Sequence, residues 1–131
     1  MNARITRTRW VDVCALDDIG PQGVECALVG RLQVAILRVA QGEGEGVYAI
    51  DSFDPYSKAY VLARGVVDEQ DGVPRVASPV SLRRFSLLTG ECLDDPSVSV
   101  SVYPVRLREG RVELQVPAIT LDSFESMEAV G

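Results

Sequence analysis

The sequence predicts an all-β domain, an antiparallel sandwich or barrel built from short strands. Apolar and polar residues alternate in many short runs, which is typical of half-buried strands. Clusters of Gly, Pro and Asp separate these runs at short intervals, and helical periodicity is weak throughout. With 131 residues, of which 47% are hydrophobic, the chain suits one domain with a single core.

Four strands are expected in the first half of the chain: Trp10–Cys14, Val24–Val29, Leu32–Val39 and Val47–Ile50. Gly30 can supply the positive φ that a two-residue hairpin turn needs between the second and third of these. The turn formers in Leu16–Gly23 indicate a loop. The acidic, glycine-rich stretch Gln41–Gly46 is expected to be a mobile loop, and residues 1–9 a flexible N-terminal arm.

Six strands are expected in the second half: Arg64–Val67, Val73–Ala77, Phe85–Leu88, Val98–Val102, Val105–Arg108 and Arg111–Val116. Strict alternation makes Val98–Val102 the clearest of them, whereas Lys58–Ala63 is too short to separate a helical turn from a strand. Pro117 is expected to end the sheet. Residues 10–116 then form the domain, and residues 117–131 form an acidic tail that is either a short amphipathic helix or a frayed end.

Charge and hydropathy argue against two classes of partner. Thirteen Lys and Arg against 19 Asp and Glu give a net charge of −6, whereas a duplex-binding protein needs a basic face. A membrane helix needs an apolar run of about 18 residues, and the sequence has none. The basic N-terminus lacks the apolar segment of a secretory signal. We therefore expect a cytoplasmic protein that binds neither nucleic acid nor membrane, and whose charge permits docking on a basic partner surface.

The sequence contains no histidine, which excludes Ser-His and Cys-His nucleophilic pairs and a histidine general base. Its three cysteines, Cys14, Cys26 and Cys92, lack the spacing of metal ligands. They are expected to be reduced and partly buried among apolar neighbours. A regulatory thiol at Cys92 is the alternative.

Two polar loops, Asp51–Ser57 and Ala77–Phe85, each contain a proline and each follow a short apolar run. This repeated pattern is the outline of a two-loop cofactor clamp. Its oxygen-bearing side chains include Asp54, Ser78 and Ser81, and a hard divalent cation usually requires more carboxylates than these. We therefore expect these side chains to hydrogen-bond the loop backbone instead.

Residues Val47–Tyr56 and Ala77–Phe85, followed by Leu88–Glu91, resemble the two cluster loops of a Rieske [2Fe–2S] domain. In that family the loops contain Cys-x-His and Cys-x-x-His, and these four residues hold the irons. Asp54 and Tyr56 stand in place of the first pair, and Ser78 and Ser81 in place of the second. The resemblance therefore implies a Rieske-like fold with vestigial ligand positions and no cluster, metal or cofactor on this chain.

Four segments more specifically resemble the small subunit of bacterial NAD(P)H-dependent assimilatory nitrite reductase: Ala49–Asp51, Asp54–Ser57, Val76–Pro79 and Thr89–Pro96. The likeness runs from about Trp10 to Val116. It implies a non-catalytic subunit that binds or stabilises a large subunit carrying FAD, an iron–sulfur cluster and sirohaem, where nitrite is reduced to ammonium in nitrogen assimilation. No catalytic residue is expected on this chain. A Rieske-type ferredoxin, or a β-domain adaptor for another oxidoreductase, is the alternative.

The loop tips are the expected interface with that partner. They hold Phe53, Tyr56, Leu82, Arg83 and Arg84, and aromatic and arginine side chains are enriched at protein interfaces. The alternative is that Phe53 and Leu82 simply cap the core between the loops.

Overall fold

The computed structural model of the protein describes residues 7–118, which form fourteen strands and two 3-10 turns. The strands are β1 (Thr8–Ala15), β2 (Val24–Val29), β3 (Leu32–Gln41), β4 (Gly44–Asp51), β5 (Phe53–Asp54), β6 (Ala59–Tyr60), β7 (Val66–Gln70), β8 (Val73–Ala77), β9 (Arg84–Ser86), β10 (Glu91–Cys92), β11 (Asp95–Ser99), β12 (Val102–Tyr103), β13 (Val105–Arg108) and β14 (Arg111–Pro117). The 3-10 turns are η1 (Leu16–Asp18) and η2 (Leu62–Arg64). All strand pairings are antiparallel, which confirms the predicted fold class.

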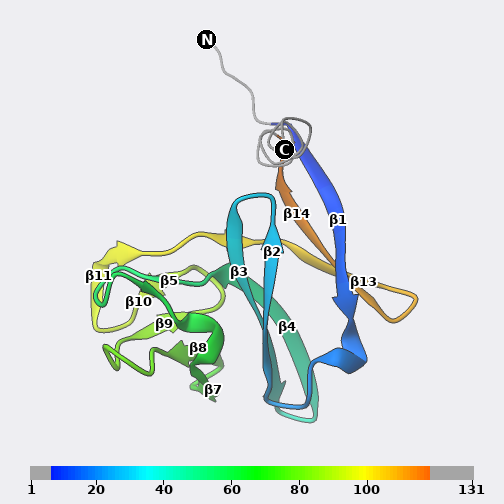
Figure 1. Cartoon of the computed structure of the whole chain (residues 1–131). Helices are drawn as coiled ribbons and strands as arrows, with labels where there is room; N and C mark the ends of the chain where they lie inside the picture. Colours follow the sequence, from blue (N-terminus) through cyan, green and yellow to red (C-terminus); the bar gives the residue numbers. More distant parts are fainter. Residues whose placement is uncertain (1–6, 119–131) are drawn as a thin grey trace.

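Three sheets and a two-stranded ribbon share these strands. Their orders are β1-β14-β13, β12-β4-β3-β2, β11-β10-β9-β8-β7 and β5-β6. Figure 1 shows the sheets of β1 to β4, β13 and β14 on one side and the short strands β7 to β11 on the other. No helix among the described residues is long and apolar enough to cross a membrane.

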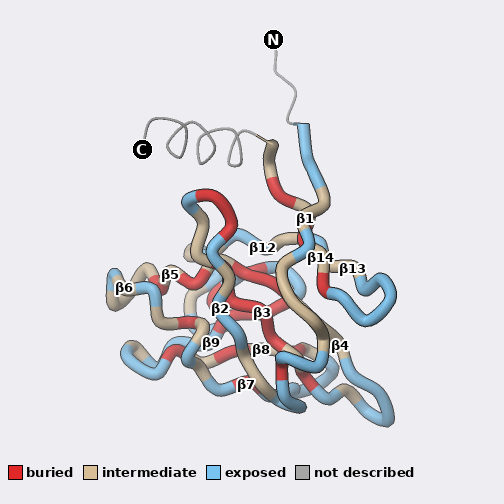
Figure 2. The backbone as a smooth tube through the Cα atoms, turned by 45° about the vertical axis from the view of Figure 1, so that its right-hand side comes forward, coloured by how far each residue is buried: buried red, intermediate tan, exposed pale blue. Residues whose placement is uncertain are grey.

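Strand β3 is the centre of the core because it is buried on both faces (Figure 2). Ala35, Leu37 and Val39 pack into one apolar cluster with Val76 and Phe85 of the five-stranded sheet. The alternate residues of β3 pack into a second cluster against the apolar side chains of β14, namely Val34 and Ile36 with Val112, Leu114 and Val116. A strand buried on both faces explains why β3 contains an unbroken apolar run as well as alternation.

The prediction of a loop at Gln41–Gly46 is wrong for most of these residues. Strand β3 continues to Gln41 and β4 begins at Gly44, so only Gly42 and Glu43 form the turn. Gly42 has φ +57, which glycine adopts at little cost. Cross-strand pairing therefore overrides the weak strand propensity of glycine here.

The strand expected at Val98–Val102 is divided between two sheets. Strand β11 ends at Ser99, and β12 begins at Val102. Between them the Val100 N–H donates to the Gly90 carbonyl (2.9 Å), and the Ser101 carbonyl accepts from the Asp51 N–H (2.9 Å). Strand β1 begins at Thr8 rather than at Trp10. The helix considered for the tail lies outside the described residues, since these end at Ala118.

Candidate functional site

The second polar loop is the β8–β9 connection, and the first polar loop lies against it. In the first loop the Lys58 N–H donates to the Asp54 carbonyl (2.8 Å). In the second the Ser78 N–H donates to the Arg83 carbonyl (2.9 Å), and the Leu82 N–H donates to the Ser78 carbonyl (3.1 Å). These backbone bonds close each loop on itself, and a side-chain hydrogen bond joins Ser78 to Asp54 between the loops.

Asp54 is fully buried, and its carboxylate joins the two loops. It accepts hydrogen bonds from the Tyr56 N–H (2.9 Å), the Ser57 hydroxyl (2.9 Å) and the Ser78 hydroxyl (2.6 Å). Burial alone raises the pKa of Asp54, but hydrogen bonds from Ser78, Ser81, the Tyr56 N–H and Ser57 together leave that pKa below its usual range. Asp54 is therefore an ionised carboxylate whose charge is stabilised by hydroxyl and amide donors.

Ser78 connects this carboxylate to the second loop. While its hydroxyl donates to Asp54, its oxygen accepts from the N–H groups of Val80 and Ser81 (both 3.1 Å). The Ser81 hydroxyl oxygen accepts from the Arg83 N–H (3.3 Å), so the prediction that Asp54, Ser78 and Ser81 hydrogen-bond the loop backbone is confirmed. We call Asp54, Ser57, Ser78 and Ser81 the interloop cluster.

The interloop cluster does not fit a Rieske [2Fe–2S] centre. Such a centre needs two thiolates and two imidazoles, whereas the matching positions hold a carboxylate, a phenol and two hydroxyls. The two side chains in the cysteine positions, Asp54 and Ser78, are hydrogen-bonded to each other. Among the described residues, no group of three or more Cys, His, Asp or Glu is arranged to hold a metal ion.

Tyr56 links the loops to the core on the side of Cys92. Its hydroxyl donates to the Cys92 sulfur (3.6 Å), and the Arg83 guanidinium lies 4.7 Å from the centre of its ring. The hydrogen bond to Cys92, together with burial, raises the pKa of Tyr56 to about 12. Cys92 itself is fully buried, which argues against a regulatory thiol there. Cys14 is half-buried as expected, and Cys26 is exposed, contrary to expectation.

The five residues expected at the interface have different surroundings. Leu82 is 73% exposed, so it does not cap the core, and Arg83 is also exposed. Phe53 is half-buried and packs edge-to-face against Tyr60 (centroids 5.1 Å apart). Arg84 is held in an ion pair with Asp94 (2.6 Å), and Tyr56 lies beneath Arg83.

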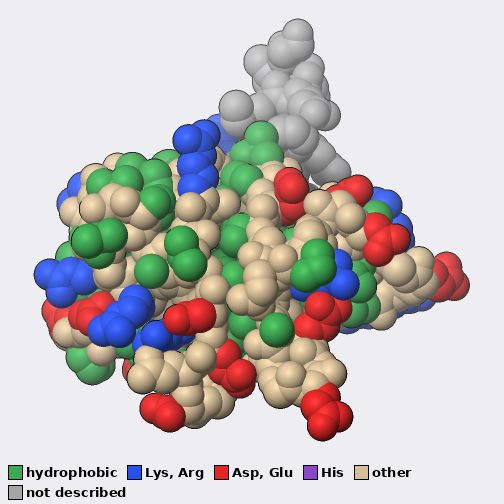
Figure 3. Space-filling model, turned by 90° about the horizontal axis from the view of Figure 1, so that it is seen from below, with side chains coloured by type: hydrophobic (Ala, Val, Ile, Leu, Met, Phe, Trp, Pro, Cys, Tyr) green, Lys and Arg blue, Asp and Glu red, His purple; other side chains and the backbone are tan. Residues whose placement is uncertain are grey.

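Two exposed side chains were missed from the sequence: Tyr60, which packs on Phe53, and Val80, two residues before Leu82 in the same loop. We call Tyr60, Val80, Leu82 and Arg83 the loop face. Leu82 has φ +66, a strained conformation for a leucine that the loop hydrogen bonds maintain. Figure 3 shows hydrophobic and charged side chains interspersed on the left of the view, the side on which Figure 1 places β9 to β11.

Comparisons with known proteins agree with this architecture. The family described as a Rieske-like [2Fe-2S] domain matches residues 9–115. The NADH nitrite reductase small subunit of Escherichia coli K12 is 41% identical over 108 residues, which cover 82% of this chain and 98% of that protein. The solved structure of the E. coli protein NirD has a TM-score of 0.73 and 39% identity, covering 84% of this chain and 98% of that chain.

A third comparison is with a longer protein. The nitrite reductase NAD(P)H large subunit of Klebsiella oxytoca is 36% identical to this chain over 103 residues, which cover 79% of this chain and 10% of that protein. The structural and sequence similarities together show that the chain belongs to the nitrite reductase small subunits, within the Rieske-like [2Fe-2S] domain family.

Proposed function

We propose that this small subunit binds the large subunit of NAD(P)H nitrite reductase through the loop face and supports it without carrying electrons itself. Nitrite is reduced to ammonium on the large subunit, where FAD, an iron–sulfur cluster and sirohaem are expected, and the complex works in the cytoplasm in nitrogen assimilation. No side chain of this chain takes a catalytic role.

The K. oxytoca large subunit supports this most directly. A segment similar to this whole domain forms part of that large-subunit chain, whereas the E. coli relative is a separate small subunit. A domain that is covalently part of the catalytic chain in one organism, and separate in another, is expected to contact the same catalytic body in both.

The loop face supports the proposed position of the contact. Leu82 and Val80 are exposed apolar side chains (73% and 60%) next to the cation of Arg83, a combination that suits the centre of a protein interface. Two backbone bonds of the second loop, from the Leu82 N–H to the Ser78 carbonyl and from the Ser78 N–H to the Arg83 carbonyl, maintain the strained backbone at Leu82, so its Cα–Cβ bond points in one fixed direction. A rigid anchor loses little conformational entropy when it binds.

The chemistry of the interloop cluster supports a role without electron transfer. A Rieske ferredoxin needs sulfur and imidazole ligands, and this chain has neither histidine nor a cysteine in either loop. The hydrogen bonds of Asp54 and Ser78 maintain the loop geometry that a cluster maintains in Rieske proteins. The ferredoxin alternative would regain support from stoichiometric iron and sulfide in the purified chain.

Binding to purified large subunit tests the loop face. In the double variant Leu82→Asp with Arg83→Glu, the new Asp tolerates the positive φ at position 82, and the new Glu reverses the charge at position 83. Loss of an interface anchor is expected to weaken binding by about thirtyfold, which corresponds to about 2 kcal/mol. The matched control is Leu107→Asp with Arg108→Glu, an exposed Leu-Arg pair on β13. Wild-type affinity of the loop variant would show that this face is not the interface.

A further inference from the structure

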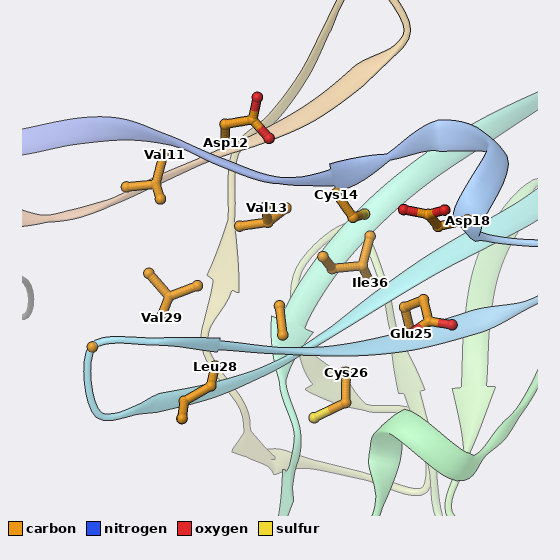
Figure 4. A pocket seen from close by; sticks show the side chains of 12 residues that line it. Val11, Asp12, Val13, Cys14, Asp18, Glu25, Cys26, Leu28, Val29 and Ile36 are labelled. Atoms are coloured by element: carbon orange, nitrogen blue, oxygen red, sulfur yellow. The ribbon is translucent and has the colours of Figure 1, made fainter.

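An open groove separates β1 from β2, the edge strands of two different sheets. Strand β1 ends the order β1-β14-β13, and β2 ends the order β12-β4-β3-β2. The groove has a volume of about 750 Å³ and is lined by Val11–Cys14 of β1, by Glu25–Val29 of β2 and by Gly30 of the following turn. The β2 part of the lining, residues 25–29, is about as long as a typical strand. Figure 4 shows Val11 and Val29 directed toward one another across it.

The edge of β2 has neither a bulge nor a proline, and its one charged side chain, Glu25, lies toward one end. Natural edge strands are usually blocked by a bulge, a proline or inward-pointing charges, because their free backbone groups pair readily with other chains. Strand β1 has such a bulge between Asp12 and Cys14. Strand β2 pairs with β3 in unbroken register, contains no proline, and carries Leu28 with 68% of its surface exposed.

Alternate backbone groups of β2 point into this groove. Two positions show which residues of this strand bond to β3. Val29 pairs with Leu32 across the two-residue turn, and at the other end the Arg38 N–H donates to the Gly23 carbonyl (3.0 Å). Antiparallel pairing alternates, so the groups of Cys26 and Leu28, which lie between these positions, point away from β3. Within residues 7–118 these groups have no hydrogen-bond partner, so an added strand can pair with them.

The groove is apolar inside and acidic at one end. Valine and isoleucine side chains line its interior, whereas the carboxylates of Asp18 and Glu25 lie at the end nearest η1 (Figure 4). Burial and the carboxylates of Asp18 and Glu25 raise the pKa of the Cys14 thiol, as expected where the local potential is negative. An occupant with apolar and basic side chains would match both parts.

We infer that the groove binds an extended segment of the large subunit with alternating apolar and basic side chains, which pairs with β2 as an added strand. This mode of recognition combines backbone hydrogen bonds with pockets for alternate side chains. The added strand would lie between β2 and β1 and cover the apolar walls of both sheets. The inference rests on the proposed function for the identity of the partner, and it adds a second contact remote from the loop face.

Charge disfavours two other occupants. Residues 119–131 of this chain contain Asp122, Glu125 and Glu128 and no basic residue, so the acidic end of the groove would repel them. A second copy of the chain would bring together two molecules of net charge −6. The large subunit is the partner that the family membership supplies.

Affinity measurements with purified large subunit test this in two ways. Cys26→Pro removes one outward N–H and no bond to β3, so it is expected to weaken binding by about tenfold, while Cys26→Ser leaves binding unchanged. Glu25→Lys reverses the charge at the acidic end and is expected to weaken binding by a similar factor. Its matched control is Glu69→Lys, which makes the same charge change on β7, the edge strand of another sheet.

The outcomes separate the two proposals. Wild-type affinity for both Cys26→Pro and Glu25→Lys, with weak binding by the loop-face variant, would overturn the groove and leave the proposed function standing. Failure of the wild-type chain to bind the large subunit would overturn the proposed function. A wild-type dimer that Cys26→Pro converts to monomer in light scattering would assign the groove to a second copy, and would also overturn the inference. Equal weakening by Glu25→Lys and Glu69→Lys would show that net charge alone is responsible.

Discussion

The polar groups of the interloop cluster are hydrogen-bonded to one another, whereas those along the β2 edge of the β1–β2 groove face open space. In the cluster, a fully buried carboxylate accepts three hydrogen bonds from two loops. In the groove, backbone groups of β2 face an open channel between two sheets. The two polar loops are thus closed by internal hydrogen bonds, whereas the edge of β2, where we infer that a partner strand pairs, lies open. Substitutions should therefore cost stability in the cluster and partner affinity in the groove.

Asp54→Ala is expected to give the largest effect on stability. It leaves the Ser78 and Ser57 hydroxyls and the Tyr56 N–H without their acceptor, which should lower the free energy of unfolding by about 3 kcal/mol. Urea denaturation measures this. Asp95→Ala is the control because Asp95 also accepts from a serine N–H and hydroxyl, both in Ser97, but near the surface, and its effect should be much smaller. Equal losses for the two variants would contradict a special role for the cluster.

The acid dependence of stability sharpens the same point. In the folded protein the pKa of Asp54 lies below its ordinary value of 3.8. Ionisation of Asp54 therefore stabilises the fold above about pH 4, and this stabilisation is lost as the pH falls further. Asp54→Asn should lower the free energy of unfolding by about 2 kcal/mol at pH 7, and the gap from wild type should shrink toward pH 2. A gap that stayed constant over this range, measured by denaturation at each pH, would show that Asp54 is not ionised in the fold.

Tyr56 gives a spectroscopic measure of the contact between loop and core. Its pKa of about 12 arises first from the bond to Cys92 and then from burial, so the neutral phenol stabilises the fold up to about pH 10 and this contribution is lost as the pH rises toward 12. The pKa of Tyr103 is also raised, chiefly by burial. In an ultraviolet titration, Tyr56 and Tyr103 should therefore ionise above pH 10. Cys92→Ala should bring one of these two transitions nearer to pH 10, and Cys92→Ser should restore it. Unchanged titration in the alanine variant would exclude the bond.

Leu28→Ser in the groove should have the smallest effect on stability. The side chain is 68% exposed, so the free energy of unfolding is expected to stay within about 0.5 kcal/mol of wild type. Thermal or urea denaturation checks this. A loss comparable with that of Asp54→Ala would mean that Leu28 belongs to the core, and the contrast between the two regions would fail.

Local patterns predicted the strands better than their partners. Alternation located β1 to β3, β13 and β14, and a single glycine located the β2–β3 turn. The same alternation in Val98–Val102 could not show that the run divides between two sheets, because that depends on distant bonds to Gly90 and Asp51. Likewise, Gly44 and Gly46 lie in a strand because they pair across the sheet with β3, which the local sequence does not indicate.

The site was predictable in its chemistry and less so in its surface. The sequence placed Asp54 and Ser78 in matching loops, and the absence of histidine already excluded a Rieske ligand set. The exposure of Val80 and Tyr60 depends on how the loops turn, and the groove depends on which strands become sheet edges. Loop direction and strand order both depend on the topology of the sheets, which short-range sequence patterns do not predict.

The uncovered edge of β2 also affects how the polypeptide behaves when it is made without its partner. A regular strand that carries an exposed leucine, and whose outward N–H and C=O groups have no partner among residues 7–118, is a template on which further copies can assemble into aggregates. Mutual repulsion between chains of net charge −6 opposes this, and added salt would weaken that protection. Pairing of β2 with the inferred segment of the large subunit would cover this template when the two subunits are made together.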